Sequence, residues 1–160
     1  MRQSLRSGTF YVNVQKFSSR EYKPWEIHEL YLDYCDETKP ALPEEVFTSI
    51  LLSSKRVRTV CLQNIVDISN GELVSQHVWV DLKSIAGVEK LRAGSSYKIT
   101  AEAMHYEKFK DCVRSFDFTF TDVNVISELS KQQETAYGNC VLKYNRMVNA
   151  AKAWLEKSAD

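Results

Sequence analysis

The fold is decided by two stretches, KRVRTVCLQNIVDI at residues 55–68 and ELVSQHVWVDL at residues 72–82. Both are long and rich in β-branched residues, which favours strands. Between them, Ser69-Asn70-Gly71 is a turn signal, because Asn and Gly tolerate a positive φ. The sequence therefore predicts a β-hairpin here, with alternate apolar residues facing a core. Those residues are Val60, Leu62, Val66 and Ile68 on the first strand, and Val74, Val78, Val80 and Leu82 on the second.

Three further stretches alternate in the way of half-buried strands. TFYVNVQKF (residues 9–17) places Phe10, Val12 and Val14 on one face. YKITAEAMHYEK (97–108) directs Tyr97, Ile99, Ala101 and Ala103 inward, and FDFTFTDV (116–123) does the same with Phe116, Phe118 and Phe120.

Helical spacing is found on both sides of this central region. Pro24, followed by Glu26 and Glu29, suits the start of one helix, and Pro43 opens a second. We interpret VFTSILL (46–52) in the second helix as a buried turn. From about residue 125 apolar residues recur at threes and fours, with Gly138-Asn139 as a position where the segment would divide into two helices. This stripe either docks onto the sheet or forms a dimer or partner seam.

Composition limits the class of protein. The chain has 160 residues, with 21 basic and 21 acidic side chains and 44% hydrophobic residues, which suits one domain over residues 1–160. The balanced charge and the many aromatic residues argue against disorder and against strong non-specific nucleic-acid binding. No secretory signal or membrane span is readable. Four dispersed cysteines look like small buried hydrophobic residues, so we expect a cytoplasmic protein.

Residues 55–123 resemble an oligonucleotide/oligosaccharide-binding barrel, the OB-fold. The resemblance rests on RTVCLQNIVDI, the hairpin into SQHVWVDL, then L-x-x-G-x-x-Y-x-I-x-A at residues 91–101, and FDFTFTDV. The HVWV segment also resembles OB-like proteins carried by phages and plasmids. The resemblance implies an α+β fold: a small antiparallel OB-like β-barrel or a strongly curved sheet (55–124), a strand plus a helical N-terminal insertion (9–54), and a C-terminal amphipathic helical segment (125–158).

Chemistry-bearing motifs are scarce, and we expect no enzymatic activity, metal or cofactor. His28, His77 and His105 lie in separate elements without a second ligand at metal-binding spacing. Cys112 has cationic neighbours but no signature of a nucleophile. Neither glycine-rich phosphate loop is present.

Nucleic-acid contact is the one functional class with positive evidence. Residues 55–114 hold ten basic against seven acidic side chains. On an OB-fold the exterior sheet face stacks bases, so the resemblance assigns stacking to aromatic residues on the non-core positions and phosphate contacts to the cations around them. The stacking residues are Trp79, His77 and Tyr106, and the cations are Lys55, Arg56, Arg58, Lys98, Lys108, Lys110 and Arg114. The alternative for Trp79 is burial beneath the C-terminal helix.

Two functions follow. The first is a binding module for single-stranded nucleic acid or a nucleoprotein complex. The second is a protein–protein effector, such as a phage- or plasmid-encoded inhibitor of a bacterial defence system (anti-CRISPR-like) or an assembly adaptor, because eight Tyr and three Trp suit a protein interface. A homodimer through the C-terminal helix is compatible with either.

Overall fold

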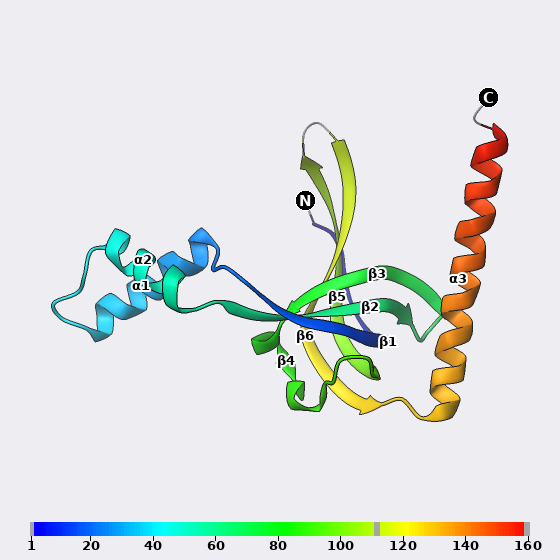
Figure 1. Ribbon diagram of the computed structural model, residues 1–160, viewed down its shortest axis with the longest axis horizontal. Helices are drawn as coiled ribbons and strands as arrows, with labels where there is room; N and C mark the ends of the chain where they lie inside the picture. The colour runs from blue at the N-terminus through cyan, green and yellow to red at the C-terminus, as the bar shows by residue number, and fades with distance from the viewer. Residues whose placement is uncertain (1, 111–112, 159–160) are drawn as a thin grey trace.

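The structure is a computed structural model that describes residues 2–110 and 113–158, with side chains described for residues 7–104 and 118–158. Within these ranges the chain is α+β, with a six-stranded mixed sheet and three α-helices (Figure 1). The elements in chain order are β1 (Arg2–Arg20), α1 (Pro24–Glu37), α2 (Glu44–Ser54), β2 (Val57–Asp67), β3 (Glu72–Asp81), β4 (Ile85–Ala86), β5 (Ser96–Lys110), β6 (Val113–Glu128) and α3 (Lys131–Ser158). Two short 3-10 turns, Leu82–Ser84 and Val88–Lys90, flank β4.

The sheet has the strand order β3-β2-β1-β5-β6-β4, and every pair is antiparallel except β4 with β6. It curves so far that β3 and β6 come within contact distance, although no ladder joins them in the described residues. The sheet is therefore not closed, and the structure does not show the barrel that the sequence suggested. At β6, β4 pairs with Val123 and Asn124 and occupies that part of the edge.

The core lies on the concave side of the curved sheet. Phe10, Val12 and Val14 of β1 are fully buried, as their alternation predicted. The inward residues predicted on β5 are also confirmed, since all four from Tyr97 to Ala103 are at most 4% exposed. On β6, Phe118 and Phe120 are buried, whereas the side chain of Phe116 lies outside the described residues.

The predicted hairpin of β2 and β3 is confirmed, but one detail of β2 is wrong. Val60 and Leu62 face the core, and Ile65 then takes the next core position in place of Val66. The cause is Asn64, whose positive φ of 52° accompanies a shift in the β2–β3 register next to it and reverses the alternation. Val66 consequently packs on the opposite face of the sheet.

The helices α1 and α2 form an arm that projects from the sheet (Figure 1). They pack on each other through Tyr31, Tyr34 and Phe47, with the Tyr34 and Phe47 rings stacked 4.9 Å apart. The interpretation of VFTSILL as a buried turn is wrong: Val46 and Ile50 are 44% and 51% exposed. Among the described residues, no second layer covers this side of the arm, so only part of each helix is shielded from water.

The helix α3 is continuous from Lys131 to Ser158, and it begins later than expected because β6 extends to Glu128. Gly138 lies inside it without dividing it. Its first turns pack on the convex side of the sheet, where Tyr137 meets Tyr11, Val66 and Leu129. The hydroxyl of Tyr137 donates to the backbone oxygens of Gln63 and Asn64, at 3.2 and 2.7 Å.

As far as Met147, α3 still lines a cavity with Gly71 to Leu73 at the β2–β3 turn, and only the part after Met147 runs free of the sheet. The β5–β6 hairpin also projects beyond the sheet (Figure 1). In this view the arm extends to the left of the curved sheet, while the hairpin and the C-terminal end of α3 both extend upward (Figure 1). Among the described residues, no helix has the length and apolar content needed to cross a lipid bilayer.

Candidate binding face on strands β2 and β3

The candidate site lies on the convex face of the sheet, opposite the core. Strand pairing places Trp79 of β3 beside Cys61 of β2, and Cys61 beside Lys16 of β1. Trp79 is 49% exposed, so it is not sealed beneath α3. The described contacts of α3 with β3 and β2 involve Leu73 and Val66, near the hairpin turn at the other end of β3. A large, half-exposed indole is therefore presented on a rigid strand.

Lys16 reaches Trp79 because of an irregularity in β1. The register between β1 and β2 shifts between Val14 and Lys16, so the extra residue returns Lys16 to the convex face. Its ammonium nitrogen lies 5.7 Å from the centroid of the Trp79 ring, within the range of a cation–π contact. The Lys16 and Trp79 side chains leave Cys61 only 1% exposed between them, and this burial raises the pKa of its thiol. Cys61 is therefore a packing residue rather than a nucleophile.

A polar row lies next to Trp79 on the same face. His77 of β3 pairs with Gln63 of β2, and Gln63 pairs with Asn13 of β1. The Gln63 amide nitrogen donates to the Asn13 side-chain oxygen at 2.8 Å. The Asn13 amide nitrogen donates in turn to the Ser96 hydroxyl at 2.9 Å. Exposed His77 ends this row, and its imidazole and the Trp79 indole are two residues apart on one face.

An ionic cluster borders the face where the arm leaves β1. The Arg20 guanidinium donates to Glu26 of α1 at 2.6 and 3.0 Å and to Asp81 of β3 at 2.9 Å. The backbone nitrogen of Lys23 also donates to Glu26, at 2.9 Å. These donors, led by Arg20, lower the pKa of the buried Glu26 carboxyl to about 2. The cluster therefore fixes the base of the arm to the edge of the sheet.

A cavity of about 270 Å³ opens beside this cluster. Trp79 and Asp81 line it from β3, and Phe120 lines it from β6, across the gap that keeps the sheet open. Arg20 and Lys23 complete its cationic side. The pocket is thus lined by both an aromatic ring and basic groups, at the point where β3 and β6 approach each other.

The structure separates the four predicted cations whose side chains it describes. Lys98 lies on the convex face, paired with Tyr11. Arg58 shares the face of Val60, opposite Trp79, and Arg56 donates to the Ser19 hydroxyl at 2.8 Å. Lys55 ends α2 and lines a groove in the arm.

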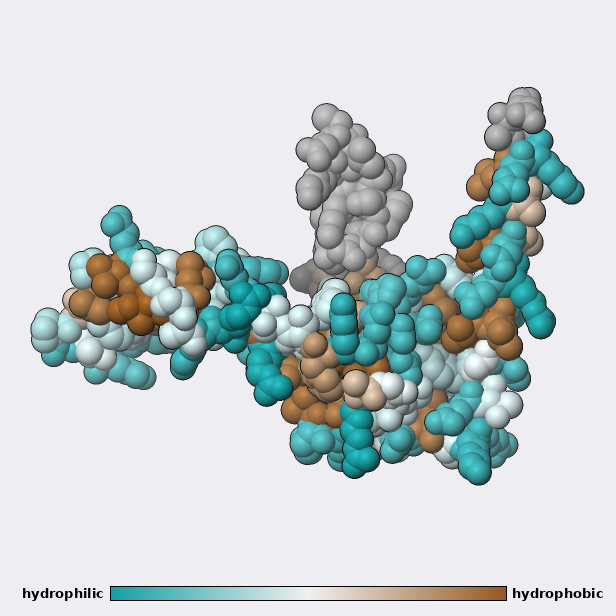
Figure 2. All heavy atoms as spheres, in the orientation of Figure 1, coloured by the Kyte–Doolittle hydropathy of each residue, from teal (hydrophilic) through white to brown (hydrophobic). Residues whose placement is uncertain are grey.

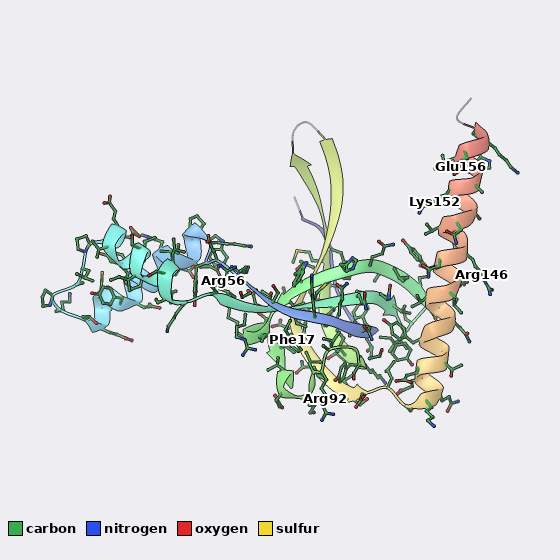
Figure 3. The ribbon with its side chains drawn as sticks, in the orientation of Figure 1. Phe17, Arg56, Arg92, Arg146, Lys152 and Glu156 are labelled. Carbon is green, nitrogen blue, oxygen red and sulfur yellow. The ribbon has the colours of Figure 1, made fainter. Side chains whose placement is uncertain are left out.

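Arg56 and Arg58 instead accompany Phe17, which is 38% exposed at the root of the arm (Figure 3 labels Phe17 and Arg56). They form a second basic and aromatic patch, on the core side of the sheet but beyond the core itself. Of the ten predicted residues, the described side chains bring only Trp79, His77 and Lys98 to the convex face.

Four predicted residues have side chains outside the described set. Their backbone belongs to the projecting β5–β6 hairpin, where Tyr106 pairs with Asp117 and Lys108 with Ser115. The other two, Lys110 and Arg114, lie close to the hairpin tip.

Sequence reasoning missed Lys16, Arg20 and Lys23 as neighbours of Trp79. Lys16 was hidden because simple alternation from Val14 places it on the core face, and only the bulge in β1 reverses this. Nothing in the local sequence signals the bulge. Among the side chains that the structure describes, no group of three or more His, Cys, Asp or Glu gathers to hold a metal ion.

Comparison with known proteins identifies no relative. No protein-family model, no curated protein and no solved structure matches the chain. The function therefore has to be argued from the geometry of the convex face.

Proposed function

We propose that this protein is a non-enzymatic, OB-like binding module that contacts single-stranded nucleic acid, free or within a nucleoprotein complex. The observation that carries the proposal is Trp79: a half-exposed indole on a rigid strand, with the Lys16 ammonium 5.7 Å from its centre. An exposed aromatic ring stacks on any base, and an adjacent cation neutralises phosphate.

The arrangement of strands supports an OB-like reading. Counting only the long strands, β1, β2, β3, β5 and β6 are five, and the ends of this sheet approach each other. OB-folds are partly open five-stranded barrels that bind oligonucleotides on the second and third strands and the loops beside them. Here those strands are β2 and β3, which carry Trp79 and His77.

In this chain the two connections that flank such a site are long and carry secondary structure of their own. The arm joins the first long strand to the second, and the β5–β6 hairpin joins the fourth to the fifth. The hairpin carries Tyr106, Lys108, Lys110 and Arg114 in its sequence. We therefore propose that single-stranded nucleic acid lies across Trp79 and His77, with its phosphates contacting Lys16, Lys98 and the hairpin cations.

Fluorescence anisotropy with labelled oligothymidylate and oligouridylate tests this directly. We expect Trp79→Ala to raise Kd by about 5- to 150-fold, the equivalent of the ~1–3 kcal/mol that one stacked base contributes. Trp25→Ala is the matched control, because Trp25 is 59% exposed on α1 and does not line the cavity beside Trp79. Lys16→Ala should weaken binding and reduce the slope of log K against log salt by about 0.7.

The result that contradicts the proposal is equally specific. Equal losses for the Trp79 and Trp25 variants, or binding that does not change with salt, would remove the convex face as a nucleic-acid site. Absence of binding to any single strand would transfer the assignment to a protein partner.

The protein–protein effector is the second candidate, and a different observation favours it. Large apolar side chains are exposed on the arm and on α3, including Trp25 and Ile50 on the arm and Trp154 on α3. Such surfaces are typical of protein interaction sites. Pull-down from a host lysate with the wild-type chain and with Trp79→Ala separates the two functions, because a partner of the arm or α3 is retained by the variant.

A further inference from the structure

The arm and the C-terminal part of α3 carry opposite charges. Residues 24–54 hold seven acidic side chains and one basic, apart from His28, whereas residues 142–158 hold four basic side chains and one acidic. The zero net charge of the chain therefore hides two oppositely charged ends. Figure 1 shows the arm and α3 at opposite ends of the molecule.

The arm has a groove between its two helices. It has a volume of about 410 Å³ and is lined by residues of α1, α2 and their flanking segments. Leu30, Tyr34, Phe47 and Ile50 supply its apolar surface. Asp33 and Glu37, one helical turn apart on α1, place two carboxylates along it, against the single ammonium of Lys55 at the end of α2. An apolar groove with an acidic margin suits a basic amphipathic helix.

The C-terminal part of α3 is such a helix. Apolar residues recur at alternating intervals of four and three, the spacing of a helix-pairing seam. The seam runs through Val141, Tyr144, Val148, Ala151 and Leu155. Val141 packs on the convex side of its own sheet and Tyr144 lies beside the β2–β3 turn, so Val148, Ala151 and Leu155 are the seam residues beyond the sheet. Met147 and Trp154, at 62% and 64% exposure, widen it on one side (Figure 2 shows the exposed apolar side chains of α3 and of the arm).

Two lysines border this stripe. Lys152 lies four residues after Val148 and three before Leu155, and Lys143 lies four before Met147, so each shares a helix face with stripe residues. Lys143 also lines a cavity with Glu72 of β3 in its own chain. Arg146 and Lys157 lie on the other side of the helix by the same spacing. The apolar stripe of α3 is therefore accompanied by positive charge at its margins.

We infer that α3 of one copy docks into the arm groove of a second copy. Its apolar stripe would cover Tyr34, Phe47 and Ile50, while Lys143 and Lys152 approach the carboxylates of Asp33 and Glu37. The groove cannot take α3 of the same chain, because the anchor at Tyr137 holds that helix at the other end of the sheet (Figure 1). This inference does not depend on the proposed nucleic-acid function.

The two surfaces are different, so the contact is head-to-tail. Each copy offers one groove and one helix, and the assembly either grows as an open chain or closes as a ring. This differs from a symmetric dimer of α3 helices, in which the arm plays no part.

Sedimentation velocity across a range of protein concentrations tests the inference. We expect the wild-type chain to self-associate, more strongly at low salt because the charges attract. The arm variant Asp33→Lys/Glu37→Lys and the helix variant Lys143→Glu/Lys152→Glu should each raise Kd by about tenfold or more and sediment as monomers. Circular dichroism melts establish that each variant is folded.

Matched controls change the same charges elsewhere on the same elements. Glu29→Lys/Glu45→Lys alters the arm at exposed positions that do not line the groove, and Arg146→Glu/Lys157→Glu alters the far side of α3. Both controls should still self-associate. Because exposed charge variants still leave the apolar contact in place, Trp154→Ala offers a second route, and we expect it to weaken association without any charge change.

Mixing the two interface variants gives the sharpest result. The groove is intact in the helix variant and the helix is intact in the arm variant, so one complementary contact remains and a 1:1 heterodimer should form. A monomeric wild-type chain at all accessible concentrations overturns the inference. So does an arm variant that still dimerises, which indicates pairing of α3 with α3, or a pair of control variants that fail to associate.

Discussion

Two apolar stretches of similar length behave in opposite ways in this protein. FYVNV of β1 buries Phe10, Val12 and Val14 completely, whereas VFTSILL of α2 leaves Val46, Ile50 and Leu52 between 39% and 51% exposed. The first lies between two neighbouring strands of a sheet that curves around it. The second belongs to a two-helix arm without a further layer. Apolar content therefore indicates where burial is possible, and the number of covering layers decides whether it happens.

The largest effect is expected in the sheet core. Phe10 is fully buried and its ring lies 5.0 Å from that of Phe120. Phe10→Ala should lower the free energy of unfolding by about 3–5 kcal/mol, because it leaves a cavity in close-packed surroundings. Phe47→Ala in the arm is the comparison, and its cost should be clearly smaller. Equal losses in urea unfolding would mean that arm and sheet are equally packed.

The anchor of α3 should give the next largest effect. Tyr137 is 6% exposed, and its hydroxyl donates to two backbone oxygens of β2. Burial of this group, away from solvent, also raises its pKa. Tyr137→Phe should cost about 1–2 kcal/mol, because the Asn64 carbonyl loses its donor while the ring contact remains. Hydrogen exchange should show faster opening of the first turns of α3, with little change in β5. Unchanged exchange would show that the helix is held by apolar contact alone.

The ionic cluster at the base of the arm should produce a smaller and pH-dependent effect. The pKa of Glu26 is lowered from 4.5 to about 2, so its charge stabilises the folded state fully above about pH 4.5 and is lost as the pH falls toward 2. Glu26→Gln should therefore lower Tm at pH 7, and the difference from wild type should shrink between pH 4.5 and 2. A constant difference across this range, measured by scanning fluorimetry, would contradict the assignment to charge.

The smallest effect on stability is expected on the exposed side of the arm. Ile50 is 51% exposed and lines the groove. Ile50→Ser should change the free energy of unfolding by no more than about 0.5 kcal/mol, as surface substitutions do. The same variant should weaken self-association if α3 of a second copy covers this residue. A large loss of thermal stability would instead place Ile50 in the fold of the arm.

The sequence predicted the sheet better than it predicted the candidate site, for a physical reason. The alternation of β1, β3 and β5 is a local property, and it located their inward residues correctly. On β2 it failed after Asn64, because a left-handed residue reverses every side chain that follows. The same kind of irregularity after Val14 brings Lys16 to Trp79, so the most useful neighbour of the candidate site was hidden from periodicity.

The cations show a related limit. Arg56 and Arg58 lie at the start of the hairpin whose second strand carries Trp79, so the sequence suggested that they are neighbours. In the structure they lie on the other side of the sheet. Arg20, which the sequence analysis did not single out, joins β1, α1 and β3 through two carboxylates. Charge counted along a chain therefore does not give the charge of a face.

By itself, the sequence determined the class of each segment: alternating strands, a hairpin turn at 69–71, two proline-led helices and an amphipathic C-terminal stretch. These depend on residue spacing and backbone preference, which are local. Only the tertiary structure decided that the sheet curves without closing, that Trp79 faces water, and that the acidic arm and the basic α3 are held apart. Those outcomes depend on bulges and on which surfaces find a covering layer, and both arise from contacts between residues distant in the chain.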